Sequence, residues 1–337
     1  MREFLNAVVL IADSLRYDHV PRTISESGTL VLTLAPALNT PQSIPSIITG
    51  RNAINHNVRR FSDSLDRRIP TLLDLFPNSC FYDHPLDPML SRVLRQRIAS
   101  KPIELNKMKE PFIWIERMME MHLPYGRIRH QNEVPYDFLD GRDYVQALRS
   151  GKMDARREYR NAAKHLEEHF FTHVDELKGG HVWDRTLVVL TSDHGELLGE
   201  HRMFTHNYPP CRALVEVPTV FVNTDFDVQF MRGVDIFATV LAMVRREGIR
   251  PCDSQDITKR KPMAGMNYAG MGNKEVLTTW KNQGDQLNLA ACRVRYKTDS
   301  WVPIPVEAAK LVFRVQELNS GIASAIERKV LAEGRFY

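Results

Sequence analysis

Two short apolar runs without polar alternation constrain the fold more than any other feature of the chain. They span residues 6–12 (NAVVLIA) and 186–190 (TLVVL). Strands that are buried on both faces have this pattern, which favours a parallel sheet covered by helices on both sides. Asp13 follows the first run, while Asp193 and His194 follow shortly after the second. Because ligands of open α/β sheets bind beyond the carboxyl ends of the strands, these three side chains are candidates for one site.

The pair Asp193 and His194 suits a divalent cation that prefers oxygen and nitrogen donors. Gly195 follows at once, and we interpret it as the residue of a tight turn. The same three residues are equally typical of an ordinary turn from strand to loop. An Asp at the end of a strand also matches a nucleotide ribose site, but the glycine-rich phosphate loop of such a site is missing near Asp13. The metal interpretation is therefore the better one for Asp13.

Composition bounds the class of protein. The chain has 337 residues, enough for one large α/β domain or two ordinary ones, and its 43% hydrophobic and 26% charged residues are typical of globular proteins. Its 45 basic and 41 acidic residues give a formal charge of +4, which favours anionic small molecules weakly and does not predict nucleic-acid binding. The four cysteines are far apart without CxxC spacing, so we expect no disulfide framework, no zinc knuckle and a reducing, cytoplasmic location.

A further candidate lies in the segment TPQSIPSIITG, residues 40–50. Pro41 suits the first turn of a helix, which is predicted to run to about Thr49 and to end at Gly50. The Thr40 hydroxyl would then lie at a helix N-terminus, where free N–H groups and the helix dipole favour a bound anion. A metal bound to this hydroxyl would lower its pKa and make it a nucleophile. The segment taken alone is better explained by Thr40 as a simple N-cap, so its wider context decides.

Three segments, in order, resemble the sulfatase-like branch of the alkaline phosphatase superfamily. They are IADSLRYDHV from residue 11, TPQSIPSIITGRNAINHNV from residue 40 and LVVLTSDHGELLGEHRMFTH from residue 187. Weaker similarities are the strand-like segment 112–125 (FIWIERMMEMHLPY), the helical segment 153–178, and the segments 217–223 and 234–248. The three ordered motifs together are far more specific than any one of them.

This resemblance implies an α/β fold with a central, mostly parallel sheet flanked by helices, and a small C-terminal α+β layer. Residues 1–250 would form the catalytic core and residues 251–337 a reduced C-terminal subdomain packed on it. The amphipathic pattern at residues 231–248 predicts a helix ended by glycine. The pattern beyond it predicts a surface loop over residues 251–274, a pair of antiparallel strands at residues 276–280 and 289–296, and a closing helix over residues 306–331.

The resemblance also implies a metal ion held by Asp13, Asp193 and His194, with Thr40 as both ligand and nucleophile. One metal ion is expected rather than two, because Met118 stands where the two-metal phosphatases of the superfamily have a carboxylate. Mn²⁺, Ca²⁺ and Zn²⁺ are each chemically acceptable for two carboxylates, an imidazole and a hydroxyl.

Three histidines would line the same site by this resemblance. His206 would contact the anionic ester, His122 would protonate the leaving group, and His201 would help to neutralise the charge of the substrate. Arg51 and His56 match a segment beside the nucleophile, and they are weaker candidates that would support the site.

The chain departs from sulfatases in two respects. Thr40 and Gln42 stand where sulfatases have the Cys or Ser of formylglycine and a proline, and Ile44 stands where they have an arginine. Ser14 replaces a second metal-binding Asp. Because threonine cannot form the formylglycine aldehyde, these departures favour the branch that uses an unmodified hydroxyl, which includes hydrolases of phosphate monoesters, phosphate diesters and phosphonates.

We therefore expect a metal-dependent hydrolase of phosphate monoesters or diesters, or of sulfate esters, with Thr40 as nucleophile. The expected partner is a small anionic ester, without nucleic acid or membrane, since the apolar run at residues 7–12 is too short to span a bilayer. Homo-oligomerisation is left open. The alternative is a binding or regulatory protein that has this fold and has lost catalysis, which the missing arginine and the missing second Asp favour.

A histidine stripe on the predicted helix 153–178 has two interpretations. It consists of His165, His169 and His173. The stripe could bind a metal, but a partly exposed flank is favoured because apolar residues supply a core-facing stripe of their own. Those residues are Leu166, Phe170, Val174 and Leu177. Glu116 and Glu120 could replace the carboxylate that is missing at Met118, but a Glu on an apolar strand or turn is expected to be solvated.

Overall fold

The two apolar runs form neighbouring strands at the centre of one large sheet. β1 (Asn6–Ala12) pairs in parallel with β6 (Thr186–Thr191) on one side and with β5 (Phe112–Met118) on the other. The sheet has eight strands in the order β10-β2-β9-β6-β1-β5-β3-β4. Among its described strands, only β9 (Glu216–Val222) runs antiparallel to its neighbours. The expected mostly parallel α/β sheet is therefore confirmed.

The structure is a computed structural model that describes residues 4–83, 90–94, 98–99, 105–126, 141–206, 210–225, 227–244, 253–259, 262–271, 274–283, 286–296, 301–304 and 306. The other strands of the large sheet are β2 (Gly28–Leu34), β3 (Asn78–Tyr82), β4 (Ile98–Ala99) and β10 (Phe230–Arg232). The described α-helices are α1 (Arg22–Ser25), α2 (Thr40–Thr49), α3 (Ala53–His56), α4 (Leu90–Leu94), α5 (Gly141–Arg149), α6 (Ala155–Gly179), α7 (Arg212–Val215) and α8 (Asp235–Met243). A short hairpin pairs β7 (Leu197–Leu198) with β8 (Phe204–Thr205).

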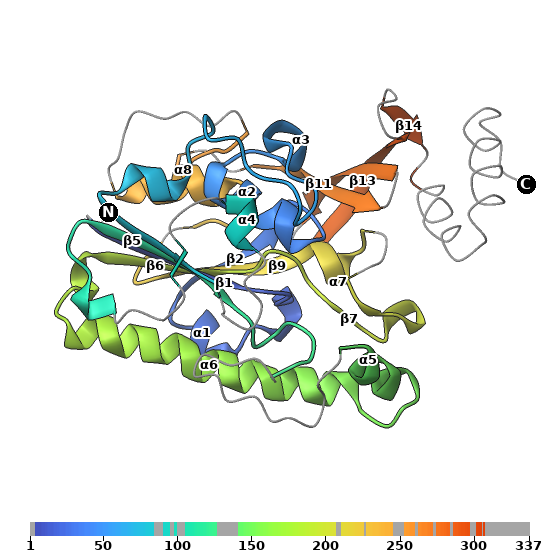
Figure 1. Ribbon diagram of the computed structural model, residues 1–337, viewed down its shortest axis with the longest axis horizontal. Coiled ribbons are helices and arrows are strands. Elements are labelled where there is room, and N and C mark those ends of the chain that lie inside the picture. Colours follow the sequence, from blue (N-terminus) through green and yellow to red (C-terminus); the bar gives the residue numbers. More distant parts are fainter. Residues whose placement is uncertain are drawn as a thin grey trace, which may run out of the picture.

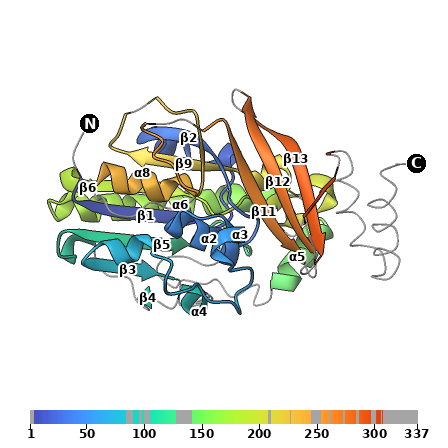
Figure 2. The same cartoon turned by 90° about the horizontal axis from the view of Figure 1, so that it is seen from above.

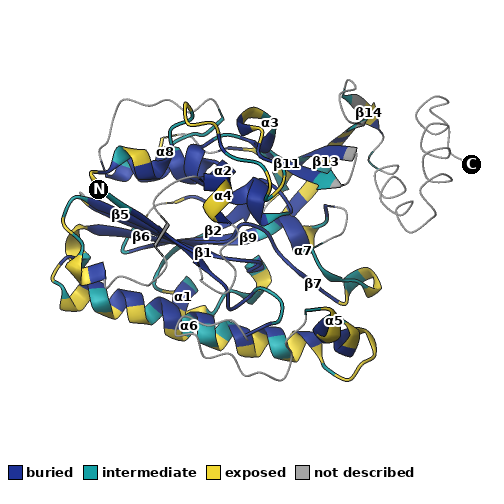
Figure 3. Ribbon diagram, in the orientation of Figure 1, coloured by how far each residue is buried: buried dark blue, intermediate teal, exposed yellow. Residues whose placement is uncertain are grey.

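Helices cover both faces of the large sheet. The long helix α6 runs along one face, while α2 and α8 lie over the other (Figures 1 and 2). Buried and exposed positions alternate along α6, as expected for a helix with one face on the core (Figure 3). The Asp154 side chain caps this helix by accepting hydrogen bonds from the backbone N–H groups of Arg156 and Arg157.

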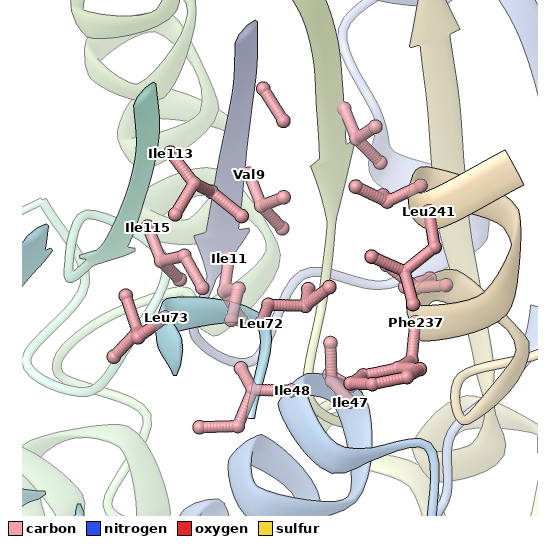
Figure 4. Close-up of a cluster of buried hydrophobic side chains, with 14 of the residues drawn as sticks. Val9, Ile11, Ile47, Ile48, Leu72, Leu73, Ile113, Ile115, Phe237 and Leu241 are labelled. Atoms are coloured by element: carbon pink, nitrogen blue, oxygen red, sulfur yellow. The ribbon is translucent and has the colours of Figure 1, made fainter. Parts of the chain in front are cut away.

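Side chains of the central strands alternate between the two faces. Val9 and Ile11 of β1 lie in one apolar cluster with Ile47 of α2 and Phe237 of α8 (Figure 4). The intervening β1 side chains belong to the cluster on the α6 face, together with Leu166, Phe170, Val174 and Leu177 of that helix. Each such buried side chain contributes roughly 1.5–3 kcal/mol to folding, so the ends of the central strands are held on a rigid frame.

A small antiparallel sheet follows the large one. Its strands are β11 (Ala264–Met271), β12 (Lys274–Gln283), β13 (Gln286–Tyr296) and β14 (Val302–Ile304), paired in that order. The predicted antiparallel pairing is confirmed, with Val276 opposite Val294. The predicted loop over residues 251–274 is wrong for β11, in which Tyr268 is buried and lies opposite Leu277 of β12.

The described residues include only parts of the two helices predicted at residues 231–248 and 306–331. The helix expected over residues 231–248 begins only at Asp235, because Phe230–Arg232 forms β10 beside β2. Its expected glycine end and almost all of the closing helix at 306–331 lie outside the described residues. The division into two units at residue 250 stays a prediction. None of the helices in the described ranges combines the length and the apolar character needed to cross a bilayer.

Candidate active site

Four of the predicted site residues converge at the carboxyl ends of β1 and β6. Asp13 directly follows β1, Asp193 and His194 lie in the loop after β6, and Thr40 is the first residue of α2. The Thr40 hydroxyl oxygen lies 3.3 Å from Asp13 Oδ2 and 3.4 Å from His194 Nε2. Ligand atoms of Asp13, Asp193 and His194 all lie within 4.8 Å of one another. All four side chains are buried.

The loop after β1 is held in place by Ser14. This residue has a left-handed backbone, with φ of 71°, and its N–H donates to Asp193 Oδ1 at 3.1 Å. Its hydroxyl donates to Asp13 Oδ1 at 3.0 Å, and the Tyr159 hydroxyl of α6 donates to its carbonyl oxygen at 2.5 Å. Ser14 therefore ties the two aspartates together instead of supplying a carboxylate of its own.

Gly195 is needed for a reason other than the predicted tight turn. Its φ is not in the left-handed region. Its N–H donates to the Leu214 carbonyl oxygen at 2.9 Å, and a Cβ on Gly195 would collide with the backbone carbonyl oxygen of Ala213. Close backbone approach thus requires glycine at this position.

The residues present fit a divalent cation. His194 Nδ1 lies 3.0 Å from the Gly195 carbonyl oxygen, which favours the tautomer with Nε2 available as a ligand facing the aspartates. Asp193 Oδ2 is buried and, within the described residues, accepts no hydrogen bond. Arg117 pairs with Asp13 at 2.9 Å, and a divalent cation would neutralise the second buried carboxylate, Asp193.

Burial and neighbouring charges shift the pKa of each of the three ionisable candidate ligands. Burial opposes the charge of Asp13, but His122, Arg117 and His194 outweigh it and hold the pKa of that carboxyl well below its usual range. Burial and the neighbouring charge of Asp13 raise the pKa of Asp193. Burial lowers the pKa of His194 to about 3, so its imidazole is neutral near pH 7, as a metal ligand must be.

Arg117 is a site residue that the sequence analysis missed. It lies on β5, has a side chain only 1% exposed, and donates from Nε to Asp13 Oδ2 at 2.9 Å and from Nη1 to Asp83 Oδ1 at 3.1 Å. The only signal in the sequence is an arginine inside the strand-like segment 112–118. Such a residue needs a buried partner, which the segment itself does not identify.

Two of the predicted histidines lie next to these four residues. The ring of His206 lies 4.2 Å from that of His194 and 6.3 Å from that of His122, measured between centroids. Glu196, itself buried, faces His206 with 3.5 Å between Oε2 and Nδ1. Burial alone would lower the pKa of His206, but its hydrogen bond to Glu196 and the charge of that carboxylate raise it. Glu196 therefore favours the protonated form of His206.

The remaining predicted residues lie elsewhere. His201 lies exposed on a 3-10 turn, Glu200–Arg202, and lines a separate surface pocket with Arg16 and Asp18. Arg51 follows the C-terminal end of α2, about 13 Å along the helix from Thr40, so the structure does not bring it to the nucleophile. His56 is buried, and its Nε2 lies 2.9 Å from the Ser46 hydroxyl of α2, which agrees with a supporting position.

The chain is similar in sequence to known proteins. No protein-family model matches the sequence. The chain is 31% identical over 278 residues to the low-salt glycan biosynthesis sulfotransferase of Haloferax volcanii, a match that covers 77% of this chain and 65% of that protein. It is 29% identical over 93 residues to the multifunctional alkaline phosphatase superfamily protein PehA of Trinickia caryophylli, covering 26% of this chain and 18% of that protein. The chain thus spans less than two thirds of these relatives.

Solved structures extend the likeness to nearly the whole chain. A 2-O GAG sulfatase superposes with a TM-score of 0.62 at 12% identity, covering 98% of this chain and 92% of the other. The phosphonate monoester hydrolase of Agrobacterium radiobacter superposes with a TM-score of 0.61 at 13% identity, covering 97% and 95%. These superpositions confirm the fold that the three motifs predict: the protein has the sulfatase-like fold of the alkaline phosphatase superfamily.

Proposed function

We propose that the protein is a metal-dependent enzyme that cleaves phosphate or sulfate esters with Thr40 as its nucleophile. The observation that carries this proposal is the position of the Thr40 hydroxyl, at the start of α2 and within 3.4 Å of two buried candidate metal ligands, Asp13 and His194. The names of the relatives and structural neighbours, which include a sulfotransferase, a sulfatase and a phosphonate hydrolase, support the same class of chemistry.

Asp13, Asp193, His194 and Thr40 Oγ1 would hold the cation. A divalent ion bound there would lower the pKa of the Thr40 hydroxyl, so that its proton leaves to solvent, and would neutralise charge on the ester. Thr40 Oγ1 then attacks the phosphorus or sulfur atom, and the bond to the leaving oxygen breaks while His122 supplies a proton to the departing alcohol. In the second step water attacks the same atom while His122 takes one of its protons, and the bond to Thr40 Oγ1 breaks, which releases phosphate or sulfate and restores both Thr40 and His122.

His206 would stabilise the transition state. Glu196 raises the pKa of His206 and so favours a cationic ring, 4.2 Å from the ring of His194, where it can face the oxygens of the transferring group. A fixed positive charge in a buried site stabilises developing negative charge more than the same charge in water. The arginine that sulfatases have near the nucleophile is absent here, and His206 would provide that charge instead.

Substitution at Thr40 tests the nucleophile. Thr40→Ala is expected to lower kcat for p-nitrophenyl phosphate, bis-p-nitrophenyl phosphate or p-nitrophenyl sulfate by roughly 10⁴-fold or more, whereas Thr40→Ser keeps a hydroxyl and retains measurable turnover. Thr49→Ala, at the opposite end of α2, is the matched control and should behave as wild type. Wild-type turnover by Thr40→Ala would remove Thr40 from the mechanism.

Metal dependence separates an enzyme from a protein that only binds. The purified protein is treated with EDTA, and Mn²⁺, Ca²⁺ or Zn²⁺ is added back separately before turnover of the three esters is followed. Activity is expected to disappear with EDTA and to return with at least one of these ions. If none of the three esters is cleaved under any condition, the alternative of a binding or regulatory protein with this fold is favoured.

Transfer to an acceptor alcohol is a second candidate for the last step. It is favoured by the relative from Haloferax volcanii, which is named as a sulfotransferase. Water and a sugar hydroxyl would compete for the same covalent Thr40 adduct, so added glucose or glycerol should raise the rate of p-nitrophenol release above the rate of sulfate or phosphate release. Equal rates at every acceptor concentration would indicate hydrolysis alone.

A further inference from the structure

A second buried cluster of polar side chains lies between β5 and α6. It contains Glu116 of β5 together with His169 and His173 of α6, which are 0%, 6% and 1% exposed. His169 Nε2 lies 3.1 Å from Glu116 Oε1, and His173 Nε2 lies 2.9 Å from Glu116 Oε2. The prediction of a partly exposed flank is therefore wrong for both histidines, and the predicted solvation is wrong for Glu116 and for Glu120, which is 1% exposed.

The two histidines point the same way because they are one helical turn apart. Residues four apart on an α-helix share a face, and the rings of His169 and His173 have centroids 4.8 Å apart. Two histidines at this spacing on one helix face are a recurring zinc-binding arrangement, which a carboxylate from another element can complete. One ligand atom each from the two histidines and Glu116 lie within 4.8 Å of one another.

The distances suit a metal with short bonds to nitrogen and oxygen. Bond lengths of about 2.0–2.2 Å place neighbouring ligand atoms of a tetrahedral Zn²⁺ about 3.3 Å apart. The two distances from Glu116 to the histidine Nε2 atoms, 3.1 and 2.9 Å, are close to that separation. Glu116 offers both carboxylate oxygens to the shared space, so it can bind through one or two of them.

A further carboxylate is hydrogen-bonded to the outer nitrogen of the His169 ring, and another lies near that of the His173 ring. Glu120 Oε1 lies 2.7 Å from His169 Nδ1, and Glu176 Oε2 lies 3.6 Å from His173 Nδ1. Trp114 Nε1 donates to Glu116 Oε2 at 2.9 Å and fixes that carboxylate. Histidines that bind metals usually donate their second N–H to a carboxylate, which sets the tautomer and leaves the other nitrogen for the metal.

We propose that Glu116, His169 and His173 bind one divalent transition-metal ion, with Zn²⁺ the best match, which fastens α6 to β5. The site is distinct from the cluster of Asp13, Asp193 and His194, and the proposal does not depend on the proposed function. Its burial and its position between a strand and a helix assign it a structural role. Of the two interpretations of the histidine stripe, metal binding thus applies to His169 and His173.

Protons are the competitor for the same nitrogen atoms. Burial lowers the pKa of His169, but the charges of Glu120 and Glu116 outweigh it and raise the pKa to about 10. Burial likewise opposes the charge of His173, and Glu116 raises its pKa. Two protonated histidine rings carry a charge of +2, and so does one Zn²⁺ bound to two neutral rings. Either arrangement neutralises the surrounding carboxylates, so the measured metal content of the protein distinguishes them.

Zinc stoichiometry tests the proposal on the full-length protein. The protein is stripped with EDTA, incubated with Zn²⁺, separated from free ions by gel filtration and measured for bound zinc. We expect close to two ions for the wild type, and one each for Asp193→Asn, which disables the candidate active site, and His173→Gln, which disables the second site. His165→Gln is the matched control, since His165 lies on the same helix and is part-exposed, and it should keep both ions.

Affinity and coordination make the test decisive even if a variant folds poorly. In the Asp193→Asn background, added Zn²⁺ should raise Tm, and His173→Gln should weaken Zn²⁺ binding at least roughly 100-fold. X-ray absorption at the zinc edge of the Asp193→Asn protein should report two imidazole ligands and needs no change to the second cluster. No zinc bound by Asp193→Asn, or zinc bound without imidazole, would overturn the second site. Two ions retained by Asp193→Asn would instead count against the proposed active-site metal.

Discussion

Arg117 offers a direct test of the electrostatics of the candidate active site. Its side chain is 1% exposed and contacts two fully buried carboxylates, Asp13 at 2.9 Å and Asp83 at 3.1 Å. Arg117→Met keeps the apolar stem and removes the charge, which leaves both carboxylates without this partner. Breaking a buried ion pair by removing one partner destabilises a protein by about 3–5 kcal/mol, whereas an exposed pair contributes about 0–1 kcal/mol. We expect the larger value here.

Urea unfolding followed by circular dichroism in EDTA at pH 7 measures this difference. Arg22→Met is the control, because the Arg22 side chain is 88% exposed and its pair with Glu26 should contribute less than about 0.5 kcal/mol. Arg117 helps to hold the pKa of Asp13 below its usual value, so this ionised carboxylate contributes stability above about pH 4 that is lost as the pH falls. In Arg117→Met the carboxylates take up protons at higher pH, and the deficit should shrink between pH 7 and pH 5. A variant within 1 kcal/mol of wild type at pH 7 would refute the argument.

Three further predictions follow from the same geometry. Glu196→Gln should lower the pKa of His206, so the fall in kcat/KM at high pH should begin at a lower pH than in the wild type. Burial lowers the pKa of His56 to about 4, so the unfolded chain takes up this proton more readily than the folded protein. The wild type should therefore lose up to ~3 kcal/mol of unfolding free energy between pH 7 and pH 4. In urea titrations His56→Gln should lack this loss. In Gly195→Ala the new Cβ should collide with the Ala213 carbonyl oxygen and weaken metal binding, as measured by EDTA treatment and metal add-back. An unchanged metal affinity would show that the loop can shift.

The parts of the fold that could be predicted are those with local signals. The strands β1 and β6 can be recognised from their apolar composition. Pro41 marks the start of α2, and Gly50, with a left-handed φ of 64°, follows its last residue. Because the active-site candidates Asp13, Asp193 and Thr40 stand at these recognisable ends, their convergence follows once the strands are placed in one parallel sheet.

The parts that could not be predicted depend on partners far away in the chain. The sequence around His169 shows a charged helix flank, and only the fold reveals that Glu116 of β5 and Glu120, which follows that strand, face this residue. Taken singly, these residues are most often solvated, and a distant partner reverses that expectation. β11 escaped prediction for a related reason, because its sequence AGMNYAGM has weak strand propensity and is held by pairing with β12.

The two charges at the end of β5 also specify how that strand pairs. Side chains alternate along a strand, so Arg117 shares a face with Ile113 and Ile115, and Glu116 shares the opposite face with Trp114. Each charge finds its partner only on its own side: Asp13 and Asp83 for Arg117, and the histidines of α6 for Glu116. A slip of one residue against β1 would turn both charges to the wrong side of the sheet and bury each without its partner. An all-apolar β5 would tolerate such a slip far better, so these buried charges make the register, and with it both candidate sites, unique.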